Sequence, residues 1–100
     1  MPEFCLTLVS PPEIEEKLLD ALLMAAGAEI FSSTPTFSHG TAHGRLSSTE
    51  QVMGRSRSVQ VQILVSADEL AALLQTLRQG FAGTGLRYWA APLAQAGEIE

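Results

Sequence analysis

The chain carries LVSPPEI at residues 8–14 and LVSADEL at residues 64–70, two versions of one pattern. Each version ends an apolar, strand-like run and opens a helix-like stretch. Each also contains Ser-x-x-Glu, with Ser10 before Glu13 and Ser66 before Glu69, which is the capping box that marks a helix start. Two strand–cap–helix units in 100 residues predict an α+β, ferredoxin-like β-α-β-β-α-β fold, in which an antiparallel sheet carries two helices on one face.

The spacing of apolar residues predicts the remaining elements. One helix is expected between Ser10 and Gly27 and a second from Ser66 to Phe81, each with an apolar stripe at helical spacing. Strands are expected at residues 4–9, 29–37, 58–65 and 86–91. Residues 38–57 have little periodicity and are predicted to form a long loop between the second and third strands, in which Thr49–Met53 are able to form a turn of helix.

The repeat also predicts which side chains share a face of the sheet. If its two copies have a common phase, the helices cover two matched sets of three: Cys5, Thr7 and Val9, and Val61, Ile63 and Val65. The opposite face then holds the large apolar side chains of the first strand, which are Phe4, Leu6 and Leu8, together with Leu64. A two-layer domain leaves that face exposed to solvent. Because large apolar side chains are rarely left exposed together, we expect other copies of the chain to cover it.

Composition places the chain among small globular proteins. Residues 1–100 are the length of one domain, and 46% of them are hydrophobic, which is enough for a core. The net charge of −5 argues against a general nucleic-acid binder. No apolar run approaches the length of a membrane span, and the N-terminus lacks a signal-peptide pattern, so a cytoplasmic location is expected. A single cysteine, Cys5, excludes an internal disulfide and a Cys-x-x-Cys site.

His39 and His43 are the first candidates for chemistry. Imidazole is a common ligand of zinc and copper, and the neighbouring glycines allow the backbone to fold around an ion. The two rings share a face only if the segment is helical, because an extended segment would separate them by about 13 Å. Two ligands do not close a site, so a third is expected from Glu50, another subunit or water. The alternative is a pair of exposed loop histidines without a ligand.

Three arginines and one glycine-rich turn form a second set of candidates. Arg45, Arg55 and Arg57 are half of the six basic residues of this acidic chain, and they are able to meet a phosphate, a carboxylate or an acidic partner. Gly83 and Gly85, followed by Arg87, offer backbone and side-chain donors to an anion. The alternatives are a solubilising loop and a tight turn.

An enzymatic role is not expected. No Ser-His-Asp order, no paired catalytic carboxylates and no phosphate-binding Walker loop occur in the sequence. Other functions on this topology also lack their residues: an RNA-recognition motif needs aromatic residues on its central strands, and a heavy-metal-associated domain needs Cys-x-x-Cys. A scaffold subunit without a ligand remains an alternative, because a fold does not determine a function.

The order of the elements resembles the PII signalling superfamily over nearly the whole chain. Residues 37–44, FSHGTAHG, lead through Gly54-Arg55 into SVQVQILV at residues 58–65, and this resembles the mobile T-loop and the strand after it. Gly83-Thr84-Gly85 resembles the Gly-x-Gly turn before the last main strand. The resemblance implies a homotrimer with ligand sites between subunits and a loop that signals to a partner protein.

A narrower resemblance concerns a small uncharacterised PII-like family. It rests on His-Gly-x-x-His-Gly-x-Leu-Ser at residues 39–47, followed by Glu50-Gln51-Val52 and Gly54-Arg55. Genes of that family often lie beside heavy-metal efflux systems of the resistance–nodulation–division type. The resemblance implies a regulator of a membrane transporter, and the histidines make copper or zinc its expected ligand.

The chain departs from PII proteins that bind ATP. Those proteins have a Gln at the loop root, a Lys directly after the Gly-x-Gly turn and arginines in the C-terminal segment. Here residues 40–42 contain no Gln, Leu86 replaces the Lys, Arg87 is displaced by one position, and residues 93–100 contain no Arg. The tyrosine that PII proteins carry for uridylylation has no counterpart in residues 38–57. An adenine-nucleotide sensor in which Arg45, Arg55 or Arg87 contacts the phosphates is the alternative to a metal or anion sensor.

Overall fold

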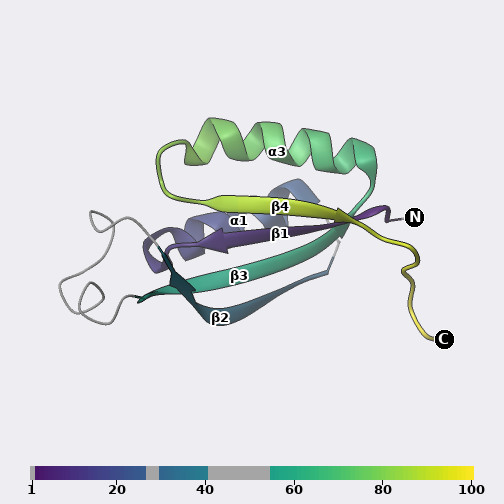
Figure 1. Cartoon of the computed structure of the whole chain (residues 1–100). Helices are drawn as coiled ribbons and strands as arrows, with labels where there is room; N and C mark the ends of the chain where they lie inside the picture. Colours follow the sequence, from purple (N-terminus) through teal and green to yellow (C-terminus); the bar gives the residue numbers. More distant parts are fainter. Residues whose placement is uncertain (1, 27–29, 41–54) are drawn as a thin grey trace.

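A computed structural model describes residues 2–26, 30–40 and 55–100 of the chain. Its elements in chain order are β1 (Phe4–Ser10), the 3-10 turn η1 (Pro12–Ile14), α1 (Glu15–Ala26), β2 (Phe31–His39), β3 (Arg55–Val65), α3 (Ala67–Phe81) and β4 (Arg87–Pro92). The strands form an antiparallel sheet in the order β2-β3-β1-β4, and the two helices pack along it (Figure 1). This arrangement confirms the predicted ferredoxin-like α+β fold.

The core lies between the helices and one face of the two central strands. In the β1–β3 ladder Leu6 pairs with Ile63, and Leu8 pairs with Val61. All four side chains are at most 1% exposed. The helices contribute five further buried side chains to the same cluster: Leu18 and Leu22 from α1, and Leu73, Leu77 and Phe81 from α3. Both helices therefore pack on the face that carries Leu6 and Leu8.

The predicted face of β1 is wrong. Cys5, Thr7 and Val9 pair with Leu64, Gln62 and Gln60, so they lie on the face away from the helices. We call this the open face; it also carries Trp89 of β4, which pairs with Thr7. Thr7 is only 2% exposed there, and its hydroxyl accepts a hydrogen bond from Gln62 Nε2 at 3.5 Å. Of the large apolar side chains predicted for this face, only Leu64 lies there, 39% exposed, because Phe4, Leu6 and Leu8 face the helices. Trp89, which is 50% exposed, also lies on the open face.

The same junction explains a second error, the capping box predicted at Ser10. Ser10 is the last residue of β1, and its hydroxyl donates to the carbonyl oxygen of Pro11 at 2.7 Å. Among the described residues, no side chain caps the start of the 3-10 turn that follows. The cap position is taken by Pro11, which precedes the 3-10 turn η1, and η1 separates the strand from α1. The two copies of the repeat thus differ at the strand–helix junction, because Ser10 belongs to β1 whereas Ser66 follows β3. They also have opposite phases: Leu8 faces the helices, and its counterpart Leu64 faces away from them.

The second copy behaves as predicted. Ser66 Oγ accepts from the backbone N–H of Glu69 at 3.2 Å, and the Glu69 carboxylate accepts from the backbone N–H of Ser66 at 2.8 Å. The pKa of the Glu69 carboxyl group is lowered mainly by the hydrogen bond from the Ser66 backbone and secondarily by the hydrogen bond with the Ser66 side chain. Both bonds favour the ionised carboxylate, so this contribution to stability is present at neutral pH and is lost as the pH falls through the lowered pKa.

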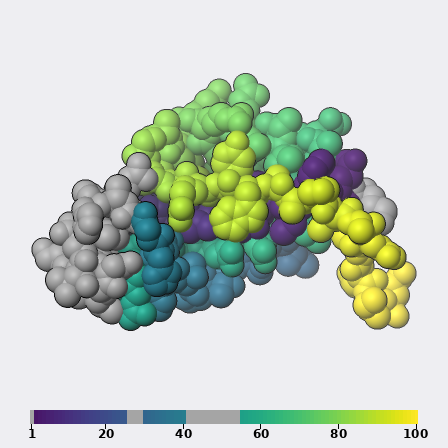
Figure 2. Space-filling view, viewed as in Figure 1, coloured from purple at the N-terminus to yellow at the C-terminus, as the bar shows by residue number. Residues whose placement is uncertain are grey.

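The hairpin of β2 and β3 is longer than predicted. Its ladder runs from Phe31 opposite Ile63 to His39 opposite Arg55. Residues 38, 39 and 55–57, predicted as loop, are therefore strand residues, whereas the predicted turn at Thr49–Met53 lies outside the described residues. Strand β2 also begins two residues later than predicted, and Pro92 is the last residue of β4 and not its stop signal. Beyond β4 the chain has no helix or strand, and it projects from the body of the molecule (Figure 2).

The cap at Ser66 gives a test of the fold. Substitution Ser66→Ala removes the hydroxyl that accepts from Glu69 N–H, and we expect it to lower the free energy of unfolding by about 1 kcal/mol. Urea denaturation at a fixed protein concentration measures this. The control is Thr76→Ala, which removes a hydroxyl from the middle of the same helix and should be neutral or slightly stabilising, because alanine is the better helix former. Equal midpoints for Ser66→Ala and the unchanged protein would contradict the assigned cap.

Candidate functional site

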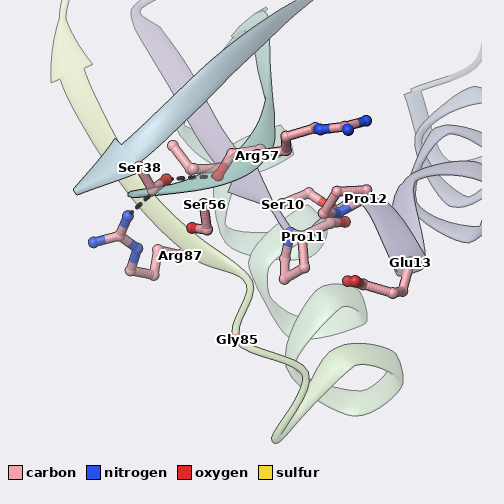
Figure 3. Close-up of a pocket in the computed structure, with 11 residues that line it drawn as sticks. Ser10, Pro11, Pro12, Glu13, Ser38, Ser56, Arg57, Gly85 and Arg87 are labelled. Atoms are coloured by element: carbon pink, nitrogen blue, oxygen red, sulfur yellow. Dashed lines mark hydrogen bonds between the residues drawn. The ribbon is translucent and has the colours of Figure 1, made fainter. Parts of the chain in front are cut away.

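Four strand ends meet around a small hollow at one end of the sheet. The end of β1 supplies Val9 and Ser10, and the beginning of β3 supplies Ser56, Arg57 and Ser58. Other walls come from Ser38 of β2, Pro11-Pro12-Glu13 and Gly85 with Arg87 (Figure 3). The volume is about 70 Å³. We call this the root hollow, because it lies where β2 ends and β3 begins, on either side of residues 41–54.

Hydroxyl groups and one guanidinium give the root hollow its polarity. Ser38 Oγ and Ser58 Oγ are hydrogen-bonded at 2.6 Å, and Ser58 is only 7% exposed. Arg87 Nη2 donates to Ser38 Oγ at 3.5 Å, which ties the start of β4 to the end of β2 (Figure 3). This Arg87–Ser38–Ser58 chain presents hydrogen-bond donors to the hollow, and a guanidinium is suited to a planar anion such as a carboxylate.

The glycine-rich turn places Arg87. Gly83 and Gly85 have φ values of 77° and 89°, in the left-handed region that favours glycine. Between them, the Thr84 hydroxyl donates to the Phe81 carbonyl at 2.7 Å and accepts from Leu86 N–H at 3.4 Å. The turn is thereby fixed from the end of α3 to Leu86, the residue before β4. The predicted tight turn is confirmed, and it carries Gly85 and Arg87 into the hollow.

The second arginine of the hollow points elsewhere. Arg57 is one of the lining residues, but its guanidinium extends away from that of Arg87 (Figure 3). Glu13 lies on the rim opposite Arg87 (Figure 3) and places a carboxylate there. The hollow is therefore one-sided: the Arg87 side attracts an anion, and the Glu13 side disfavours it.

His39 and Arg55 lie just outside the root hollow, as partners at the last position of the β2–β3 ladder. The Arg55 guanidinium lies over the Phe37 ring at 4.3 Å from its centroid, a cation–π contact. His39 is exposed. His43, Arg45 and Glu50 lie outside the described residues. Within residues 2–26, 30–40 and 55–100, no group of three or more His, Cys, Asp and Glu side chains is arranged to hold a metal ion.

The structure brings together part of the predicted anion set. Arg57, Gly85 and Arg87 meet at the root hollow, whereas Gly83 lines a different cavity beneath α3. Sequence reasoning missed Ser38, Ser56 and Ser58. A strand of alternating polar residues through 56–62 carries the signal for the last two, but their meeting with Ser38 depends on the ladder register, which no local pattern encodes.

Comparison with known structures places this geometry in a class. The chain is similar to the nitrogen regulatory PII-like protein CPII from Thiomonas intermedia K12, solved bound to ADP, AMP and bicarbonate, with 15% identity, a TM-score of 0.75 and coverage of 99% of this chain and 98% of that one. It is also similar to the periplasmic divalent cation tolerance protein CutA from Archaeoglobus fulgidus, with 15% identity, a TM-score of 0.69 and coverage of 98% and 89%. The fold is that of the PII-like superfamily.

The family follows from the sequence as a whole. Residues 1–100 match the family described as "Protein of unknown function (DUF3240)", and the chain belongs to it. A solved DUF3240 protein from Shewanella baltica OS155 is 22% identical, with a TM-score of 0.79 and coverage of 100% of this chain and 99% of that one. No protein with a curated description matches the sequence.

Proposed function

We propose that the chain is a single-domain, non-catalytic PII-like regulator of the cytoplasm. It acts as a homotrimer, binds a small anion or a transition metal at and around the base of its long loop, and modulates a partner such as a heavy-metal efflux transporter. The observation that carries the proposal is the Arg87–Ser38–Ser58 chain, because it joins the glycine-rich turn to the strand that leads into residues 41–54. A ligand that changed these hydrogen bonds would act directly on the strand ends on either side of residues 41–54.

The size of the root hollow favours a small anion. An apolar cavity of roughly 150 Å³ holds benzene, and the root hollow, at about 70 Å³, is about half that size, which suits an ion of a few heavy atoms, such as bicarbonate. One of the ligands of CPII is bicarbonate. Arg87 would meet the negative oxygens, and the hydroxyl groups of Ser38 and Ser56 would supply neutral hydrogen bonds.

The second candidate is an adenine-nucleotide sensor, which the ADP and AMP bound to CPII support. A nucleotide is far larger than the root hollow of one chain, so it would need walls from a second subunit. Leu86 follows the turn where a cation would be needed. These two features make the small anion the first choice.

The anion test uses calorimetry with sodium bicarbonate and with ADP as separate titrants. We expect bicarbonate to bind and Arg87→Gln to weaken it at least about tenfold, the loss of a charge-assisted hydrogen bond. The control is Arg78→Gln, which removes a guanidinium from α3, away from the root hollow, and should leave bicarbonate binding unchanged. Tight binding of ADP without bicarbonate binding would replace the first candidate with the second, and no heat from either titrant would contradict both.

The metal part of the proposal rests on His39, together with His43 and Glu50. His39 ends β2 and is exposed, so its imidazole is available as a ligand. The name of CutA, a divalent cation tolerance protein, supports a metal in this structural class.

The metal test titrates zinc and copper into the full chain and into a variant with both His39→Ala and His43→Ala. We expect micromolar or tighter binding that the double substitution abolishes, because imidazole supplies the ligands. Cys5→Ser is the control: it removes a thiol from the open face and should leave the affinity unchanged. An unchanged affinity of the double histidine variant for zinc and copper would contradict the assignment of the histidines as metal ligands.

The homotrimer is supported by the apolar side chains of the open face. Leu64 and Trp89 are large and at least 39% exposed, and burial of each would contribute about 1.5–3 kcal/mol. No helix within residues 2–26, 30–40 and 55–100 is long and apolar enough to span a bilayer. We propose, from the resemblance of residues 37–44 to the T-loop, that a transporter would be contacted through the region of residues 38–57.

Light scattering tests the assembly. We expect three times the 10.7 kDa mass of one chain, and we expect Trp89→Glu to shift the protein towards smaller species, because it would bury an unpaired charge in the interface. The control is Met24→Glu, which adds the same charge to an exposed position of α1. A monomer at micromolar concentration, or the same mass for Trp89→Glu, would contradict the proposed interface.

A further inference from the structure

A second cavity lies between α3 and the sheet, on the other face of β4 from Arg87. Its volume is about 270 Å³. The apolar lining comes from Leu74, Leu77 and Phe81 of α3, Leu8 of β1 and Leu86. Leu8, Leu77 and Phe81 belong to the core and are at most 6% exposed. The cavity is thus an opening into the hydrophobic core beneath α3, which runs alongside β4 (Figure 1).

The mouth of this cavity is polar. Arg78 of α3 and Tyr88 of β4 line it, and Arg78 Nη2 donates to Tyr88 Oη at 3.3 Å. Tyr88 is 47% exposed, and Arg78 is also exposed, so a ligand is able to reach both groups. Of the described residues that line the cavity, Arg78 alone carries a charge. The complementary ligand has one negative group for the mouth and an apolar body for the interior.

We infer that this cavity binds a small monocarboxylate with a hydrocarbon body. The carboxylate would accept hydrogen bonds from the Arg78 guanidinium, whose planar fork matches two carboxylate oxygens. The body would lie among the leucines and Phe81. A phosphate ester or nucleotide does not fit, because its sugar and further charges would be desolvated against an apolar wall without partners. This site is separate from the root hollow and does not depend on the proposed function.

The volume sets the size of the body. An apolar cavity of roughly 150 Å³ holds benzene, and the present cavity of about 270 Å³ is nearly twice as large. It therefore accommodates a benzene-sized ring with a short arm that carries the carboxylate to Arg78. The compound 3-phenylpropanoate has these parts, and 3-phenylpropan-1-ol is its uncharged counterpart.

The experiment titrates 3-phenylpropanoate into the full chain and follows the ring signals of Phe81 and Tyr88 by NMR. We expect saturable shifts of both rings at millimolar or lower concentration. Arg78→Gln should weaken binding of the carboxylate at least about tenfold, the loss of a charge-assisted pair, and leave the alcohol unaffected. Arg78→Lys should retain part of the affinity, since it keeps the charge without the fork.

Three further measurements serve as controls. Leu74→Phe is expected to fill the cavity and to remove binding of both compounds. Acetate, which has the charge without the body, should not shift the rings of Phe81 and Tyr88. Circular dichroism confirms that each variant is folded. The inference would be overturned by the absence of saturable shifts with the unchanged protein, by equal affinity for the acid and the alcohol, or by full carboxylate affinity in Arg78→Gln. These outcomes do not depend on whether the protein binds bicarbonate or a metal.

Discussion

The register of β1 against β3 is the constraint on which the rest of the molecule depends. It sets Leu6 opposite Ile63 and Leu8 opposite Val61, so four nearly inaccessible side chains share the face that both helices cover. A slip of one residue would turn the β1 pair towards the open face, and each lost side chain costs about 1.5–3 kcal/mol. The same register brings the end of β1 beside the beginning of β3, and β4 pairs with the other edge of β1. The root hollow exists because these ends meet.

The side chains of β4 alternate, and this gives the molecule two unlike cavities at one turn. Arg87 belongs to the polar root hollow, whereas Leu86 and Tyr88 face the apolar cavity beneath α3. Gly85 lines both. The geometry of a single glycine turn therefore positions the walls of two sites, although their ligands have different chemistry.

The sequence predicts the fold where local signals agree with tertiary contacts. The Ser66 junction has a capping box, a strand before it and an apolar stripe after it, and all three are confirmed. At Ser10 the same Ser-x-x-Glu pattern is misleading, because the serine is the last residue of β1 and Pro11 takes the cap position of the turn that follows. The face assignment of β1 fails because the two strands of the repeat have opposite phases in the sheet. His39, Arg55 and Arg57 appeared to belong to a loop because β2 and the start of β3 are rich in serine and threonine, without the apolar alternation that marks a half-buried strand.

The candidate site was predictable only in part. Gly85 and Arg87 are two positions apart in the sequence, at a recognisable turn and the strand that follows it. Ser38 and Ser58 lie on different strands, and their hydrogen bond arises from pairing of the whole hairpin. The register of that hairpin is a long-range property that residue spacing does not reveal.

A position can require glycine because a Cβ atom has no space or because φ is positive, and Gly83 distinguishes these two reasons. A Cβ atom there would meet no atom within 4 Å, yet φ is 77°. The constraint is torsional and not steric. Asparagine and aspartate, which tolerate the left-handed region better than other side chains, are therefore the replacements that relatives of this chain can accept at this position with little loss of stability. Valine or isoleucine would be selected against although there is ample space for them.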